Sequence, residues 1–159
     1  MKWIGVVDTM FARVDMGAIA IDALAAKPDR GQAFELVRRT VPGFKDLAVE
    51  AQRLIQTHGC AIVLVMGMPG PEAIDQLCAH EASLGIMAAK LNTSTHILEA
   101  FVHESEAMGD PALLAQICRE RVGKHALNAY DMLFQPQTLV ARAGRGVRQG
   151  FADAGPVAA

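Results

Sequence analysis

Four residues that can move protons are the first candidates for chemistry in this chain. Asp8 follows the first apolar run of the sequence, and His80 lies within an expected helix. His103 and Glu104 follow the fourth apolar run. Imidazole exchanges protons near neutral pH, and a carboxylate can assist it. We predict that these four are the catalytic residues, with His103 preferred for its position. His80 also fits a helix histidine that bonds the backbone or a neighbouring subunit.

A second set of residues could bind a flat heteroaromatic ring that carries hydroxyl groups. Phe11 beside polar groups suits ring stacking, although it fits packing beneath its own loop equally well. Pro42 fixes the backbone, and Gly43 allows a ligand to approach closely. Lys45 and Asp46 could bond a polyol or form an ordinary solvated pair. The expected substrate-binding residues are Thr9, Phe11, Arg13, Val41, Pro42, Gly43, Lys45, Asp46, Gly67, Met68, Pro69, Gly70, Arg148, Gln149 and Asp153.

Several classes of protein are disfavoured by what the sequence lacks. Residues 67–70 are not followed by the lysine and threonine of a phosphate-binding loop, and no GxGxxG or HExxH motif occurs. The net charge of −2, without a basic stripe, argues against nucleic acid as a partner. We expect no membrane span and no signal peptide. The three cysteines form no CxxC pair, so we expect buried thiols in a cytoplasmic protein.

The elements that must position these residues alternate between strands and helices. Apolar runs predict strands at 3–7, 34–37, 61–66 and 97–102, and helices are expected at 15–26, 45–57, 71–91 and 110–134. This alternation predicts an α/β fold with an open parallel sheet covered on both faces. Ligands of such sheets bind beyond the carboxyl ends of the strands. The polar clusters that follow the four strands are therefore expected to converge on one edge.

Two further expectations concern the third helix and the end of the chain. The third helix is expected to face the sheet with Ile74, Leu77, Cys78, Leu84 and Met87. We expect one domain over residues 1–159, with 141–159 as an ordered segment near the active site or a subunit interface.

Apolar residues make up 52% of the chain and charged residues 20%, which favours an oligomer.

Many short motifs in one order resemble the archaeal-type riboflavin synthases. They lie at residues 7–9, 11–16, 39–43, 45–47, 67–70, 78–85, 101–104, 125–128 and 148–156. The similarity covers essentially the whole chain. It implies a relationship to lumazine synthase, a flavodoxin-like sheet of four parallel strands, and a pentamer with sites between subunits.

The resemblance also implies an activity. Two molecules of 6,7-dimethyl-8-ribityllumazine would react by four-carbon transfer to give riboflavin and 5-amino-6-ribitylamino-2,4(1H,3H)-pyrimidinedione. This chemistry requires no redox cofactor, although the carboxylates of Glu104 and Glu106 leave room for a divalent metal such as magnesium. Holding two reactants in register supplies much of the rate enhancement.

Two alternative functions remain open at this point. Lumazine synthases carry an arginine-containing segment after the third strand that holds a substrate phosphate. This chain has Met68, Pro69, Gly70 and Pro71 there, which disfavours that activity. The other alternative is a non-catalytic protein that binds a flavin or a lumazine.

Overall fold

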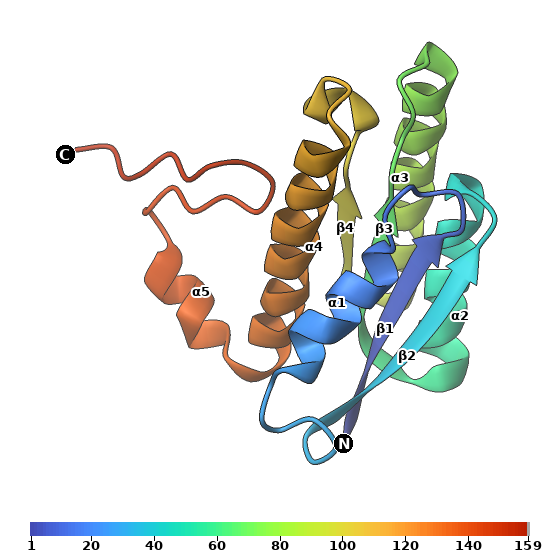
Figure 1. Cartoon of the computed structure of the whole chain (residues 1–159). Coiled ribbons are helices and arrows are strands. Elements are labelled where there is room, and N and C mark those ends of the chain that lie inside the picture. Colours follow the sequence, from blue (N-terminus) through green and yellow to red (C-terminus); the bar gives the residue numbers. More distant parts are fainter. Residues whose placement is uncertain (159) are drawn as a thin grey trace.

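A sheet of four parallel strands forms the centre of the computed structural model, which describes residues 1–158. The strands are β1 (Lys2–Thr9), β2 (Phe34–Val41), β3 (Cys60–Gly67) and β4 (Ile97–Phe101). Their order across the sheet is β2-β1-β3-β4 (Figure 1). The expected flavodoxin-like arrangement is confirmed, because the chain reverses its winding direction at β1 and places helices on both faces.

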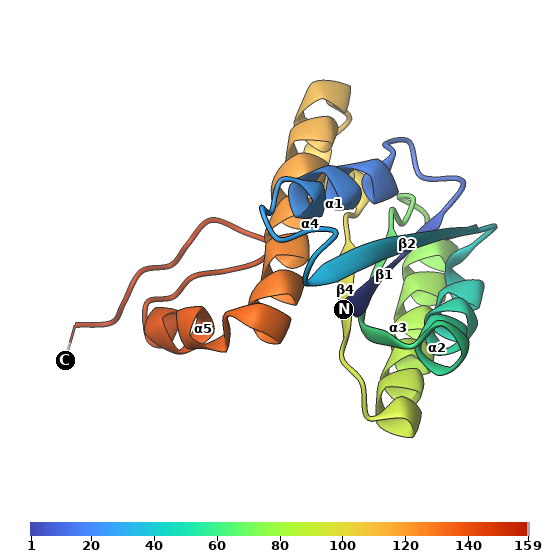
Figure 2. The ribbon, with the colours of Figure 1, turned by 90° about the horizontal axis from the view of Figure 1, so that it is seen from below.

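Two pairs of helices cover the two faces of the sheet. Helices α1 (Met16–Ala25) and α4 (Pro111–Phe134) pack on one face, and α2 (Leu47–His58) and α3 (Ala73–Thr93) pack on the other (Figure 2). Strand residues alternate between the two cores, so that Val6 belongs to the α1–α4 core and Val7 to the α2–α3 core. Burial on both faces explains the continuous apolar run of β3.

The expected helix ends are confirmed where their capping chemistry is strong. Asp15 caps α1 by accepting a hydrogen bond of 2.9 Å from the N–H of Ala18. Asp110 caps α4 in the same way, accepting from Ala112 at 2.8 Å. Gly59 ends α2 with φ of 72°, a left-handed conformation that glycine adopts without strain.

Strand β2 is longer than the sequence predicted. It pairs with β1 along its whole length, and the last pairs are Asp8 with Thr40 and Thr9 with Val41. Val41 is therefore a buried strand residue rather than part of the loop that follows. Short 3-10 turns, Phe44–Asp46 and Glu104–Ala107, follow β2 and β4.

The predicted inner face of α3 is wrong. The residues that pack on the sheet are the small ones and a single isoleucine, namely Ala79, Ala82, Ile86 and Ala89. Ile74, Leu77, Leu84 and Met87 are exposed instead, together with Leu91. Small residues occupy this face because α3 packs closely against α2, where a β-carbon at Gly85 would lie 3.3 Å from that of Ala48. We call the five exposed residues the α3 apolar stripe.

The chain continues after α4 in a way that the sequence did not predict. Gln135 and Pro136 stop α4 at Phe134 as expected, but Pro136 is also the first residue of a further helix, α5 (Pro136–Arg142), which was not expected. The remaining segment turns back and runs beside α4 before it extends away from the α/β body (Figures 1 and 2).

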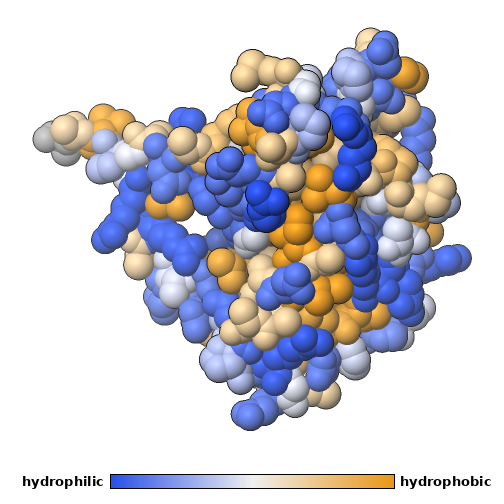
Figure 3. Space-filling model, in the orientation of Figure 1, coloured by the Kyte–Doolittle hydropathy of each residue, from blue (hydrophilic) through white to orange (hydrophobic). Residues whose placement is uncertain are grey.

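Apolar surface remains on the outside of the molecule. On the face seen in Figure 3, hydrophobic surface continues down the middle between hydrophilic flanks. Such surface is a common feature of chains that associate.

Candidate active site

Three phenylalanine rings connect the loops at the carboxyl edge of the sheet. Phe11 follows β1, Phe44 follows β2, and Phe101 ends β4. The ring centroids of Phe11 and Phe44 are 5.4 Å apart, and those of Phe44 and Phe101 are 4.9 Å apart. The Phe44 ring lies against Gly67 so closely that a side chain there would overlap it. We call these three rings the aromatic row. The Phe44 ring is buried, whereas Phe11 at one end of the row offers exposed apolar surface suited to a flat ligand.

Some of the predicted binding residues lie next to this row, whereas the Met68 side chain is buried in the α1–α4 core. Met68 is fully buried, and Pro42 and Gly43 connect β2 to the 3-10 turn that carries Phe44. Lys45 extends from that turn to Glu81 on α3, with 2.5 Å between Nζ and Oε2. This contact raises the pKa of Lys45, so its side chain stays cationic.

Asp8 is buried in a polar cluster on the α1 side of the sheet. Its Oδ2 lies 2.6 Å from Nη2 of Arg38, and its Oδ1 accepts a hydrogen bond of 2.7 Å from the Thr40 hydroxyl. Arg38 also contacts Asp15 at the start of α1, at 2.6 Å. Gly17 has no room for a side chain beside this cluster. The carboxylate of Asp8 thus links β1 to β2 and, through Arg38, to the start of α1.

A surface groove of about 500 Å³ runs beside β4, which is an edge strand of the sheet. Phe101 and His103 line it from β4 and the following turn, and His125 lines it from α4. Arg148 and Gln149 line it from the C-terminal segment. Because Phe101 also belongs to the aromatic row, the groove and the row form one continuous region.

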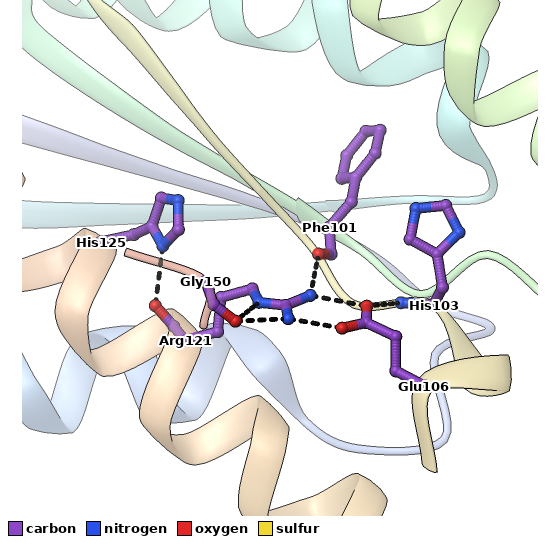
Figure 4. A network of polar contacts seen from close by, with 6 residues as sticks. All are labelled: Phe101, His103, Glu106, Arg121, His125 and Gly150. Carbon is purple, nitrogen blue, oxygen red and sulfur yellow. Dashed lines mark hydrogen bonds and ion pairs between the residues drawn. The ribbon is translucent and has the colours of Figure 1, made fainter. Parts of the chain in front are cut away.

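Arg121 connects the parts of this groove (Figure 4). Its guanidinium donates to the carbonyl oxygen of Phe101 at 2.9 Å and to that of Gly150 at 2.6 Å. It also forms a two-pronged ion pair with Glu106, with contacts of 2.7 and 2.5 Å. Glu106 in turn accepts a hydrogen bond of 2.9 Å from the N–H of His103. One planar side chain therefore holds the end of β4, the His103 turn and the C-terminal segment.

The charge state of Glu106 follows from these contacts. Partial burial would raise the pKa of Glu106, but the hydrogen bonds from Arg121 and from the His103 N–H outweigh it. The net effect is a pKa below the ordinary carboxyl range. Glu106 is therefore ionised at neutral pH and stays paired with Arg121.

Residues 148–151 of the C-terminal segment lie against α4. The Phe151 ring lies 5.3 Å from the guanidinium carbon of Arg121. Gln149 accepts a hydrogen bond of 3.0 Å from Asn128 on α4, and Asp153 accepts one of 3.0 Å from the N–H of Arg148. The segment therefore lines the groove of its own subunit.

The four predicted acid–base residues occupy different surroundings in the described part of the chain. His103 lines the groove, whereas Asp8 is held by Arg38. Glu104 forms an ion pair of 3.2 Å with Arg13. His80 is exposed on α3, three residues after Leu77 and four before Leu84, on the side of the α3 apolar stripe.

Three findings bear on other expectations for this chain. Within residues 1–158, no cluster of three or more histidine, cysteine or acidic side chains could hold a metal ion, and no helix could cross a membrane. Burial raises the pKa of Cys60 and of Cys118 to about 11, so both thiols stay protonated and unreactive.

Sequence reasoning missed Phe44, Arg121 and His125. Phe44 lies between the predicted residues Gly43 and Lys45 but was not itself predicted to belong to the site. Arg121 and His125 lie four residues apart on the same buried face of α4 as Leu114 and Cys118. Two polar residues on an apolar helix face were the available signal, since buried polar groups need partners.

Comparison with known proteins agrees with this geometry. The profile of the family described as 6,7-dimethyl-8-ribityllumazine synthase matches residues 2–136. The chain belongs to this family. The match contains the whole sheet and α1 to α4, and it ends at the first residue of α5.

Similar proteins of this family extend the match to nearly the full length. A riboflavin synthase of Methanothermobacter thermautotrophicus is 51% identical over 97% of this chain and 98% of its own length. Riboflavin synthases of Aeropyrum pernix and Archaeoglobus fulgidus are 41% and 38% identical, over at least 97% of each chain. The C-terminal segment thus falls within the region that these relatives share.

Proposed function

We propose that this chain is a riboflavin synthase, which converts two molecules of 6,7-dimethyl-8-ribityllumazine into riboflavin and 5-amino-6-ribitylamino-2,4(1H,3H)-pyrimidinedione. Full-length similarity to proteins named riboflavin synthase carries this proposal. An aromatic row beside a groove with two imidazoles and several hydrogen-bonding groups is suited to flat rings with polyol chains.

The proposed roles of the residues follow from their places in the structure. The aromatic row would stack a lumazine ring, and the polar ends of Arg148 and Gln149 would bond ribityl hydroxyls. His103 would move a proton in the groove. Asp8, through Arg38, would hold the β1 loop that carries Phe11 and Arg13.

The chemistry we propose needs no redox cofactor. One lumazine gives four carbons to the other, so the atoms of the two substrates equal those of the two products. The enzyme then has two tasks. It holds the two rings in the relative orientation that the reaction needs, and it transfers protons. Purified protein freed of small molecules by dialysis should therefore form riboflavin without an added oxidant or reductant.

One experiment separates this function from the two alternatives. Purified protein is incubated with 6,7-dimethyl-8-ribityllumazine alone, and riboflavin is measured by absorbance and chromatography. Riboflavin formation supports the proposal. Activity only with a four-carbon sugar phosphate and a ribitylaminopyrimidine would instead indicate a lumazine synthase, and binding without turnover would indicate a carrier.

We further propose a homo-oligomer, a pentamer by resemblance to the family, with sites completed between subunits. The α3 apolar stripe supports association, because its five side chains are between 50% and 81% exposed. In the same subunit Phe11 and the groove are open at the surface, where a second copy could cover two stacked ligands. Light scattering at micromolar concentration should give the mass of a pentamer rather than 17.0 kDa.

A further inference from the structure

The buried histidine of α4 has a fixed proton arrangement. His125 is 8% exposed, and its Nδ1 lies 2.8 Å from the carbonyl oxygen of Arg121. A carbonyl oxygen only accepts hydrogen bonds, so Nδ1 carries the proton. The other ring nitrogen, Nε2, therefore has a lone pair when the ring is neutral.

The same histidine lines the groove that holds His103 and Phe101 (Figure 4). The ionisable groups that face it are Glu99 and His103 from the β4 side, Glu106 from the turn, Arg121 from its own helix and Arg148 from the C-terminal segment. Burial lowers the pKa of His125, the hydrogen bond to the Arg121 carbonyl opposes this, and the charge of Arg121 lowers it further. The ring is therefore neutral at neutral pH.

We propose that His125 is a further catalytic residue of this site, the general base that removes a proton from a methyl group of the bound lumazine. This inference rests on the proposed function. A buried imidazole with one nitrogen fixed as a donor and the other free to accept is the arrangement that a general base requires. In this proposal His125 accepts the methyl proton. His103 is left to donate a proton or to orient the ring of the second lumazine molecule.

The proton step is balanced without any additional reactant. The lone pair of Nε2 forms an N–H bond while a methyl C–H bond breaks. The electron pair of that C–H bond stays on carbon and delocalises into the lumazine ring, which attacks the second molecule. The imidazolium later returns the proton to an amino nitrogen of the pyrimidinedione as it leaves, which regenerates neutral His125.

The test uses His125→Asn in the full-length protein. An asparagine amide can still donate to the Arg121 carbonyl, but it places no base where Nε2 was. We expect kcat for riboflavin formation to fall about 10²–10⁴-fold. The lumazine dissociation constant, measured by fluorescence, should change by less than about threefold. In D₂O, deuterium entry into the substrate methyl group should slow in the same proportion as kcat.

Two controls make the outcomes distinct. His96→Asn changes an exposed histidine before β4 and should leave kcat unchanged. If His125→Asn fails to fold by circular dichroism, His125→Gln replaces it, because a glutamine amide can hydrogen bond but cannot accept a proton at neutral pH. Wild-type protein that makes no riboflavin overturns the proposed function. Active wild-type protein with more than a tenth of its kcat retained by the variant overturns only the role of His125.

Discussion

At the scale of single residues, the absence of a side chain at Gly67 shapes the site. We expect Gly67→Ala to push the Phe44 ring out of the aromatic row, because a β-carbon there would overlap the ring. Overpacking of this kind costs about 1–3 kcal/mol. Urea unfolding and lumazine titration should show lower stability and weaker binding together.

Gly123→Ala is the matched control for that substitution. Gly123 lies within α4, and a β-carbon there would meet nothing within 4 Å. Alanine favours the helix over glycine by about 0.5–1 kcal/mol, so this variant should be more stable than the wild type. If both glycine variants lose stability equally, the close contact between Gly67 and Phe44 is not the cause.

The role of His103 is also a prediction about one residue. His103→Ala should reduce kcat about 10²–10⁴-fold if its imidazole moves a proton in the transition state. The lumazine dissociation constant should change much less, since the aromatic row and the groove remain. A loss of only a few-fold in both quantities would make His103 a binding contact, and His80 would then have to be tested.

At the scale of elements, the C-terminal segment can be tested by removal. A chain that ends at Arg148 loses Gln149, the Gly150 carbonyl that Arg121 contacts, and the Phe151 ring above it. We expect substrate binding to weaken strongly while the α/β body stays folded. Binding is measured by lumazine fluorescence and the fold by circular dichroism. Unchanged kinetics would show that the segment has no role in the groove, and loss of the oligomer would make it a subunit clamp.

The α3 apolar stripe is the second element that can be tested. Leu84 lies in its centre and is half exposed, so Leu84→Glu should leave the fold intact while it places a charge in the proposed subunit contact. We expect the oligomer to dissociate at micromolar concentration, as measured by light scattering. Gln56→Glu, on an exposed polar position of α2, is the control. An unchanged mass for Leu84→Glu would place the subunit contact elsewhere.

Features that neighbouring residues determine were predictable from the sequence, whereas features that depend on distant contacts were not. The strands and helix starts were predictable, because apolar runs and caps such as Asp15 and Asp110 act locally. The inner face of α3 was not, because alanines and leucines compete for the core and the available space decides between them. The contacts of Arg121 were equally hidden, since they join residues 15 to 29 positions apart.

At the scale of the whole molecule, the groups that link stability to pH include two beside the groove, His125 and Glu106. The pKa of His125 is lower in the folded protein, so the unfolded chain binds a proton more readily. Stability should therefore fall as pH drops below about 6.5, where unfolded histidine titrates. The pKa of Glu106 is also lowered, so its contribution is lost only in stronger acid, below about pH 4.

Urea unfolding between pH 7.5 and pH 5 checks this prediction. The wild type should lose stability over that range, and His125→Asn should lose less, because the titrating group is gone. Glu106→Gln should still lose stability between pH 7.5 and pH 5 as the wild type does, since Glu106 titrates at lower pH. If the free energy of unfolding falls equally with pH in the wild type and in His125→Asn, the lowered pKa of His125 is contradicted.

The contacts of Arg121 also fix the order in which the molecule can be completed during synthesis. Phe101, Glu106 and Arg121 are made before Gly150, which follows Arg121 by 29 residues. Folding proceeds from the N-terminus as the chain is made. The contacts of Arg121 with Phe101 and Glu106 can therefore form before Gly150 is available. The groove beside β4 is finished only when Gly150 joins them, so the sheet can be folded before the molecule is able to hold its ligand.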